Sequence, residues 1–254
     1  MKQIPNLFTL LNLVFGCMAI VVILQNGITI GTGPAGEYLL DLPEKIWLAA
    51  LFIAIAAVVD FLDGFVARLL NASSEMGKQL DSLADVVSFG VAPGLILYQF
   101  LRLSFAREDD GLDTSVLWLL PAVVVPCAAA YRLARFNIDT GQNYNFKGVP
   151  VPAVGLVVAS LPMIYWHTNS EQLINLILNK WVLYAIIFVL SYLMVSTLPI
   201  MALKFKDFSF KSNQPKLIML VISLIAVITL KWAGMPVVFL AYIIVSLFFK
   251  NKKE

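Results

Sequence analysis

The sequence is poor in charge and in the residues that bind zinc or form disulfides. Only 13% of its 254 residues are charged, about half the share of a soluble domain, while 60% are hydrophobic and the mean hydropathy is +0.85. This composition excludes an ordinary soluble protein. The single histidine and the two distant cysteines, without a CxxC pair, exclude a zinc site and a disulfide framework. A net charge of +2 gives no indication of nucleic-acid binding.

Long apolar runs take up most of the chain. A spanning helix needs about 20 mainly apolar residues, so the runs predict an all-α integral membrane protein with about eight transmembrane helices. The first run is too long for a signal peptide and has no small-residue cleavage site, so we expect it to span the membrane. The last two runs flank the turn KWAGMP at 231–236 and form a hairpin. The predicted segments are Leu7–Leu24, Ile46–Leu70, Leu80–Leu101, Ser115–Phe136, Val149–Trp166, Trp181–Leu203, Leu217–Leu230 and Met235–Phe249.

Positive charge is distributed unevenly between the loops. If the N-terminus starts in the cytoplasm, most of the 18 lysines and arginines fall on the cytoplasmic side, and the acidic loops at 37–44 and 108–113 fall on the opposite side. Membrane proteins concentrate Lys and Arg in their cytoplasmic loops. We therefore expect a protein of the cell (inner) membrane with both termini in the cytoplasm.

Four aspartates interrupt the apolar pattern in the stretch DFLDGFVARLLNASSEMGKQLDSLAD at 60–85. Asp60 and Asp63 have a spacing of i, i+3, and Asp81 and Asp85 a spacing of i, i+4, so each pair lies on one helix face. A carboxylate inside a spanning segment costs about 2.5–3.5 kcal/mol, and four together add repulsion between like charges. A strong compensating interaction is therefore expected.

The neighbouring cations are too few to supply that interaction. Arg68 and Lys78 cannot neutralise four carboxylates, whereas divalent cations can, because Mg²⁺ binds carboxylate oxygens together with substrate phosphates. Two such ions held between helices would polarise a phosphoryl group. Gly64 and Ala67 remove side-chain bulk from the same helix face and leave room for a nucleotide. Arg68 offers a bidentate donor set to a phosphate.

Two alternative roles of the aspartates stay open. Salt bridges could satisfy them in a purely structural role, although ionisable groups inside a membrane are functional by default. A secondary cation transporter is the stronger alternative, and it predicts carboxylates spread through the depth of the membrane. Here they cluster in one hairpin among Gly, Ala and Arg, which favours phosphate chemistry and a site at the cytoplasmic end.

The spacing of these residues resembles a known family signature. The pattern D-x-x-D-G-x-x-A-R, eight further residues and then G-x-x-x-D-x-x-x-D runs from Asp60 to Asp85 and is similar to that of the CDP-alcohol phosphatidyltransferases. The resemblance implies a six-helix catalytic membrane domain at residues 1–205. A cytoplasmic linker and the C-terminal hairpin follow at 206–254.

The resemblance also implies a reaction, in which an alcohol displaces CMP from a CDP-linked lipid. It implies two divalent cations, Mg²⁺ or Mn²⁺, held by Asp60, Asp63 and Asp81, with Asp85 completing the site. Asp85 is also the candidate base that takes the proton of the incoming hydroxyl. The residues implied to contact the cytidine diphosphate are Asp60, Asp63, Gly64, Ala67, Arg68 and Gly77.

Four further stretches concern the acceptor: IPNLFTLLNL at 4–13, SFGVAPG at 88–94, YRLARFN at 131–137 and FKGVPVPA at 146–153. Together they resemble the membrane-embedded phosphatidylserine synthases. This resemblance implies L-serine as the nucleophile, CDP-diacylglycerol as the lipid substrate, and membrane lipid as a partner. Glycerol 3-phosphate or inositol phosphate stays an alternative acceptor, although either would need more phosphate-binding cations than the sequence places beside the hairpin.

Polar residues at other helix ends complete the predicted site. Arg132 and Arg135 could bind the carboxylate of serine. Either one could equally well be an anchoring residue at the cytoplasmic end of its helix, as the positive-inside rule predicts. Lys147 is a candidate phosphate ligand. Asn6 and Thr9 could reach the nucleotide, and helix capping accounts equally well for Asn6. The close-packed small residues lead us to expect a homodimer.

Overall fold

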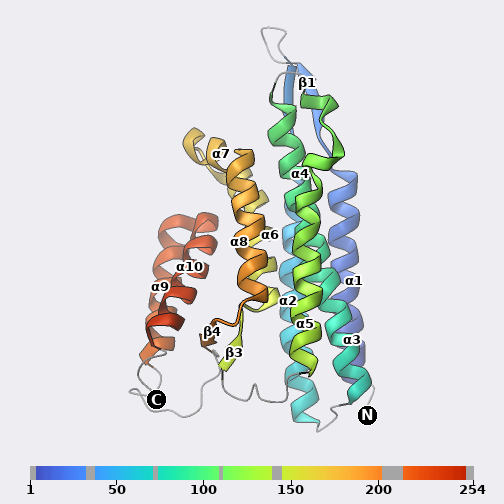
Figure 1. The fold of residues 1–254 in the computed structure, drawn as a ribbon, viewed down its shortest axis with the longest axis vertical. Helices are drawn as coiled ribbons and strands as arrows, with labels where there is room; N and C mark the ends of the chain where they lie inside the picture. Colours follow the sequence, from blue (N-terminus) through green and yellow to red (C-terminus); the bar gives the residue numbers. More distant parts are fainter. Residues whose placement is uncertain are drawn as a thin grey trace.

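The protein is an elongated bundle whose helices run along the long axis of the molecule (Figure 1). The computed structural model describes residues 4–32, 38–70, 74–108, 111–138, 145–201 and 214–249. Two antiparallel strand pairs accompany the helices, β1 (Thr29–Thr32) with β2 (Tyr38–Asp41) and β3 (Asn145–Lys147) with β4 (Pro199–Met201). The α-helices of the described residues are α1 (Ile4–Gln25), α2 (Trp47–Leu69), α3 (Glu75–Asp85), α4 (Ala92–Ala106), α5 (Val124–Ile138), α6 (Val151–His167), α7 (Glu171–Ile177), α8 (Lys180–Val195), α9 (Gln214–Leu230) and α10 (Gly234–Phe248).

Several of these helices are long and apolar enough to cross a membrane. Among the described residues, four runs are long and apolar enough to span a membrane. The pair α7 and α8 is bent by 60° at its junction and would make a fifth span if it is counted as one. The apolar helix α6 has 17 residues and is therefore about 25 Å long, against about 30 Å of hydrocarbon. The protein is thus an all-α integral membrane protein, but the predicted number of eight spans is not confirmed. The four longer runs are Pro5–Gln25, Glu44–Leu69, Glu75–Ala106 and Gln214–Phe248.

The described core lies where the central helices meet. Buried side chains from α2, α4, α6 and α8 pack together there, and those of α1 join them from the side. Lipid-facing residues of α9 and α10 are exposed and apolar, as expected of helices surrounded by hydrocarbon. Fully buried members of the core include Ile53, Phe100, Val158 and Ile187.

The beginning of α3 differs from the prediction. The helix begins at Glu75 rather than at Leu80, because the hydroxyl of Ser74 caps its first turn. This hydroxyl accepts a hydrogen bond from the Gly77 N–H at 3.0 Å. Asp81 therefore lies well inside the helix, on a regular backbone.

The end of α8 also differs from the prediction. The segment predicted to be helical as far as Leu203 leaves the helix at Val195. Pro199 is the physical reason, because the residue before a proline avoids helical backbone and proline lacks an N–H. Pro199 instead begins β4, which pairs with Lys147 of β3.

A π-helical turn at Val86–Val91 joins α3 to α4. Glycines on two neighbouring helices contact it: a Cβ at Gly16 of α1 would lie 2.9 Å from the Ser88 Cα, and a Cβ at Gly155 of α6 would lie 3.0 Å from the Phe89 Cα. A Cβ at Gly16 would clash with the Ser88 backbone, and a Cβ at Gly155 would require Phe89 to shift. The turn is therefore held directly against α1 and α6, and it fixes the end of α3.

The last two helices form a hairpin (Figure 1). Lys231 adopts a φ of 51° at the turn, and a Cβ at Gly234 would lie 2.6 Å from the carbonyl oxygen of Ala226. The hydroxyl of Tyr242 donates a hydrogen bond of 2.8 Å to the carbonyl of Met201. The hairpin is thus attached to β4 by a direct contact.

The contact between Gly16 and the π-helical turn leads to a prediction about stability. Gly16→Ala should lower the free energy of unfolding by roughly 1–3 kcal/mol, because a methyl group there forces the Ser88 backbone away. The measurement is the midpoint of thermal unfolding in detergent micelles. Gly64→Ala is the matched control, since its Cβ would meet nothing within 4 Å. Equal midpoints for the two variants would contradict the prediction.

Candidate active site

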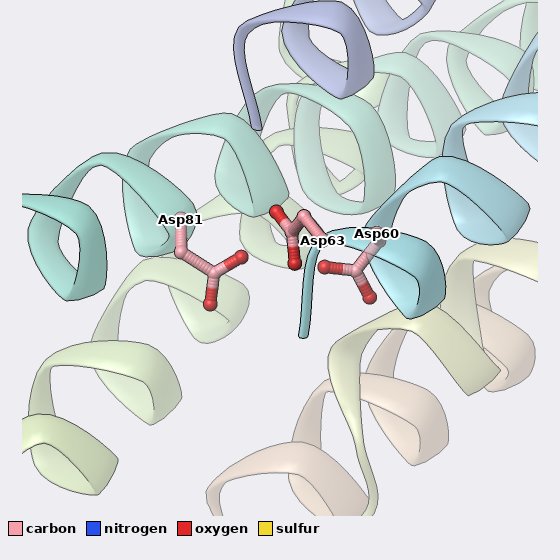
Figure 2. Close-up of side chains that lie close together, drawn as sticks. All are labelled: Asp60, Asp63 and Asp81. Carbon is pink, nitrogen blue, oxygen red and sulfur yellow. The ribbon is translucent and has the colours of Figure 1, made fainter. Parts of the chain in front are cut away.

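Three aspartates from two helices converge at one end of the bundle. Asp60 and Asp63 lie on the last turns of α2, and Asp81 lies on α3. One oxygen of each carboxylate lies within 4.8 Å of the others. Figure 2 shows the three side chains pointing toward one another from α2 and α3. Asp60 and Asp63 thus lie on one face of α2, as their i, i+3 spacing predicts. Helix α3 brings the carboxylate of Asp81 to the same place.

Helix α1 lies against this cluster. The hydroxyl of Thr9 donates a hydrogen bond of 2.8 Å to Oδ2 of Asp63. Both residues are buried, with exposed fractions of 3% for Thr9 and 7% for Asp63. Thr9 therefore orients one carboxylate of the cluster.

The cluster fits a divalent cation. Oδ1 of Asp81 is buried and has no hydrogen-bond partner among the described residues. Hard cations such as Mg²⁺ and Ca²⁺ bind carboxylate oxygens at about 2.0–2.6 Å, so ligand atoms around one ion are at most about 5 Å apart. The observed spacing and the all-oxygen donor set both meet this requirement.

Asp85 lies apart from the three-aspartate group, one turn further along α3. Its exposed fraction is 6%, and its Oδ1 accepts a hydrogen bond of 3.2 Å from Nδ2 of Asn12 in α1. It is the last residue of α3 and directly precedes the π-helical turn. Its predicted roles as fourth metal ligand and as base stay predictions.

A pocket of about 500 Å³ opens beside the cluster, a size in the range of small-molecule sites. A Cβ at Gly64 would meet nothing within 4 Å, whereas a Cβ at Gly77 would lie 2.9 Å from Oδ1 of Asn6. Gly64 thus leaves the pocket open, and Gly77 allows α3 to approach α1. The pocket is lined by Pro5, Asn6, Thr9, Asp63, Gly64, Ala67, Ser74, Glu75, Gly77, Lys78 and Asp81.

The sequence therefore predicted much of this lining. Seven of the lining residues were expected to contact nucleotide or metal, and they come from three helices. Arg68 is exposed on the last turn of α2, one turn past Gly64. Only the backbone of Lys147 is described, in β3 opposite Pro199; its side chain lies outside the described part.

The two predicted serine ligands differ in their surroundings. The guanidinium of Arg135 donates hydrogen bonds of 2.7 and 2.8 Å to the carbonyls of Val195 and Ser196, at the end of α8. Arg132 is buried, its Nε has no hydrogen-bond partner in the described part of the chain, and its charge interacts with that of Asp85. Of the two, Arg132 is the one associated with the site.

Among the residues of the site that were not predicted as ligands, Asn12 and Lys78 make side-chain hydrogen bonds to other helices. Asn12 contacts Asp85, and Lys78 lines the pocket while its Nζ donates a hydrogen bond of 3.0 Å to the carbonyl of Asn137. A helical pattern could have identified Asn12, since it follows Thr9 by three residues on the same face of α1. Lys78 had no comparable signal beyond its place next to Gly77.

Comparison with known proteins gives a consistent result. A family model described as CDP-alcohol phosphatidyltransferase matches residues 2–193. A Helicobacter pylori (strain J99) protein named CDP-diacylglycerol–serine O-phosphatidyltransferase is 35% identical over 176 residues, covering 66% of this chain and 63% of the relative. A Bacillus subtilis protein of the same name is 33% identical over 171 residues, covering 65% of this chain and 78% of the relative. A Methanothermobacter thermautotrophicus archaetidylserine synthase is 30% identical over 133 residues, covering 52% of this chain and 53% of the relative.

The alignment thus spans less than two thirds of the Helicobacter relative and more than two thirds of the Bacillus relative. The family match includes every residue of the three-aspartate cluster and of the pocket. The signature in the sequence, the convergence of its aspartates and the family match agree: the chain belongs to the CDP-alcohol phosphatidyltransferase family.

Proposed function

We propose that the protein transfers a phosphatidyl group from CDP-diacylglycerol to the hydroxyl of L-serine, releasing CMP and forming phosphatidylserine. The convergence of Asp60, Asp63 and Asp81 beside an open pocket is the observation that carries the proposal. The family membership and the names of the similar proteins from Helicobacter and Bacillus support it.

The three-aspartate cluster is the proposed site for two divalent cations, Mg²⁺ or Mn²⁺, with Asp85 as a further ligand. When bound, such ions neutralise phosphate charge and polarise the phosphoryl group. Thr9 holds the Asp63 carboxylate in place through its hydrogen bond. This orientation before substrate arrives is the contribution of α1 to the site.

The pocket is the proposed site of the cytidine diphosphate group. Gly64, Ala67 and Gly77 keep its wall free of bulky side chains, so the nucleotide can approach the backbone of α2 and α3. Asn6 lines the pocket from α1, and in this proposal it contacts the nucleotide. In this proposal Arg68 and Lys147 bind phosphate oxygens.

Asp85 is the proposed base. It takes the proton of the serine hydroxyl as the hydroxyl oxygen bonds to the phosphorus that carries diacylglycerol, and the bond from that phosphorus to CMP breaks. Burial at the end of α3 keeps Asp85 away from bulk water, which protects the lipid-linked diphosphate from hydrolysis. Its position one turn beyond Asp81 on α3 supports this role.

Arg132, rather than Arg135, is the proposed ligand of the serine carboxylate. Arg132 is buried near Asp85, and the charges of the two side chains interact. Arg135 uses both terminal nitrogens to hold the end of α8. Its role in this proposal is to position α5 and α8.

The proposed arrangement in the membrane places this end of the bundle in the cytoplasm. We infer a six-helix catalytic domain at residues 1–205 and a linker with the terminal hairpin at 206–254, giving eight spans in the cell membrane with both termini inside. The unequal distribution of Lys and Arg supports this orientation. The first part of the linker, residues 206–213, lies outside the described residues. The homodimer stays a prediction.

The two alternative functions, a cation transporter and a transferase with a phosphorylated acceptor, each need charged residues in places other than those observed. A cation transporter needs ionisable groups through the depth of the membrane, whereas the aspartates of the described spans gather at one end of α2 and in α3. A phosphorylated acceptor would need phosphate-binding cations beside Asp85 in addition to Arg132. Among the described residues, Arg132 is the cation whose charge interacts with that of Asp85. Serine is therefore the acceptor of the proposal.

The decisive test of the function uses purified protein, CDP-diacylglycerol, Mn²⁺ or Mg²⁺, and a panel of labelled alcohols. Lipid product and CMP should form with L-serine and not with glycerol 3-phosphate or inositol phosphate. Chelation of the metal should abolish the product, and either ion should restore it. Product with another acceptor alone would refute serine but not the reaction class, and cation uptake into sealed vesicles without CMP release would refute both.

The role of the cluster predicts the effect of one carboxylate. Asp81→Asn should lower CMP release by at least about 100-fold, because a neutral amide binds a divalent cation less strongly and leaves the phosphate charge uncompensated. The midpoint of thermal unfolding should fall little, since the change preserves the shape of the side chain. Asp113→Asn, in the exposed turn at Gly111–Asp113, is the matched control. Full activity of Asp81→Asn would contradict the metal site.

The assignment of the two arginines predicts different effects of the same substitution. Arg132→Lys should raise the KM for serine by about 10- to 100-fold, because lysine keeps the charge and loses the bidentate fork. Its KM for CDP-diacylglycerol should not change. Arg135→Lys should instead lower the midpoint of thermal unfolding, since it loses a hydrogen bond to α8. The reverse pattern would show that Arg135 binds serine.

A further inference from the structure

Asn12 is a polar residue in the middle of an apolar spanning helix. Its exposed fraction is 0%, and it lies on α1 with Thr9 one turn before it. Each of the two donates a hydrogen bond to an aspartate of a different helix, Thr9 to Asp63 of α2 and Asn12 to Asp85 of α3. One face of α1 therefore contacts both halves of the acidic hairpin.

Asn12 is attached to α3 and to the turn that follows it. Its side-chain Nδ2 donates to Oδ1 of Asp85 at 3.2 Å, and its main-chain carbonyl accepts a hydrogen bond of 3.1 Å from the hydroxyl of Ser88. Gly16, one turn further along α1, lets the two backbones approach closely at Ser88. These contacts fix the distance between α1 and the end of α3, so the position of Asp85 is tied to Asn12.

The second polar atom of the amide is not used within the described residues. Oδ1 of Asn12 is buried and has no hydrogen-bond partner there. A buried amide with one unpaired atom is unfavourable for stability, and an apolar residue of the same size would avoid this penalty. Packing alone therefore does not account for an asparagine at this position, whereas a role in orienting Asp85 does.

We propose that Asn12 is a positioning residue for the transfer reaction: its amide N–H fixes one oxygen of Asp85, which leaves the other oxygen for the hydroxyl of the acceptor alcohol. This inference rests on the proposed function, in which Asp85 is the base. Asn12 acts through Asp85 and does not touch the reacting atoms. Groups that orient a reactive side chain commonly contribute about 10- to 100-fold when they are lost.

The arrangement also distinguishes the roles of the two α1 residues. Thr9 orients a carboxylate of the cluster proposed to bind metal, so its loss should alter the dependence on metal concentration. Asn12 orients Asp85, so its loss should reduce turnover and leave the KM for CDP-diacylglycerol unchanged. The two effects can be separated in one set of kinetic measurements.

The test compares Asn12→Leu with the unchanged full-length chain in detergent micelles, with CDP-diacylglycerol, L-serine and Mg²⁺. Asn12→Leu should lower kcat by about 10- to 100-fold, while the KM for each substrate stays the same. Asn26→Leu is the matched control: Nδ2 of Asn26 donates to the carbonyl of Val22, in the last turn of α1, at 2.7 Å. This control should keep the parent kcat.

Different outcomes would overturn the inference. An unchanged kcat, or a raised KM for serine at constant kcat, would show that Asn12 does not position Asp85. If Asn12→Leu does not fold, Asn12→Asp decides, because it keeps the shape and replaces the donor by a carboxylate; a parental kcat would refute the role. Failure of both variants to fold would assign Asn12 to the fold alone. A parent chain that makes no phosphatidylserine would refute the proposed function itself, which is a separate result.

Discussion

Asp60, Asp63 and Asp81 bring carboxylate oxygens within 4.8 Å of one another between two membrane helices, where isolated charges are costly and like charges repel. Nothing in an apolar bundle favours such an arrangement, so the surrounding helices must hold it in place. Thr9 and Asn12 of α1 do so by hydrogen bonds to Asp63 and Asp85. The close contact of α1 with α3 is thus a requirement of the acidic site.

Small residues make this contact possible. A side chain at Gly16 would strike the backbone of Ser88, so the π-helical turn after α3 approaches α1 closely there. Gly155 plays the same part between α6 and Phe89. Where side chains are absent, backbone can approach backbone, and polar groups of neighbouring helices come within hydrogen-bonding distance. The helices α9 and α10, by contrast, expose bulky apolar residues.

Sequence reasoning was most successful where a local pattern has a local consequence. The i, i+3 spacing of Asp60 and Asp63 determines that both lie on one face of α2, and the glycines of the signature line the pocket as expected. It failed where the outcome depends on contacts between distant segments. The pairing of β4 with β3 could not be anticipated from an apolar run, although Pro199 gave a reason to end α8 early. The use of Arg135 to bind carbonyls of α8 depends on how helices dock and leaves no trace in local spacing.

The hydrogen bond from Tyr242 to the carbonyl of Met201 has a consequence for the whole molecule. Met201 belongs to β4, whose partner β3 contains Lys147, and both β4 and α10 lie beyond the part matched by the family model. A peripheral hairpin whose outer surface is in contact with hydrocarbon is therefore joined through main-chain pairing to a strand that belongs to the matched part. A change in the tilt of the hairpin would therefore be transmitted to β4 and, through the strand pair, to β3.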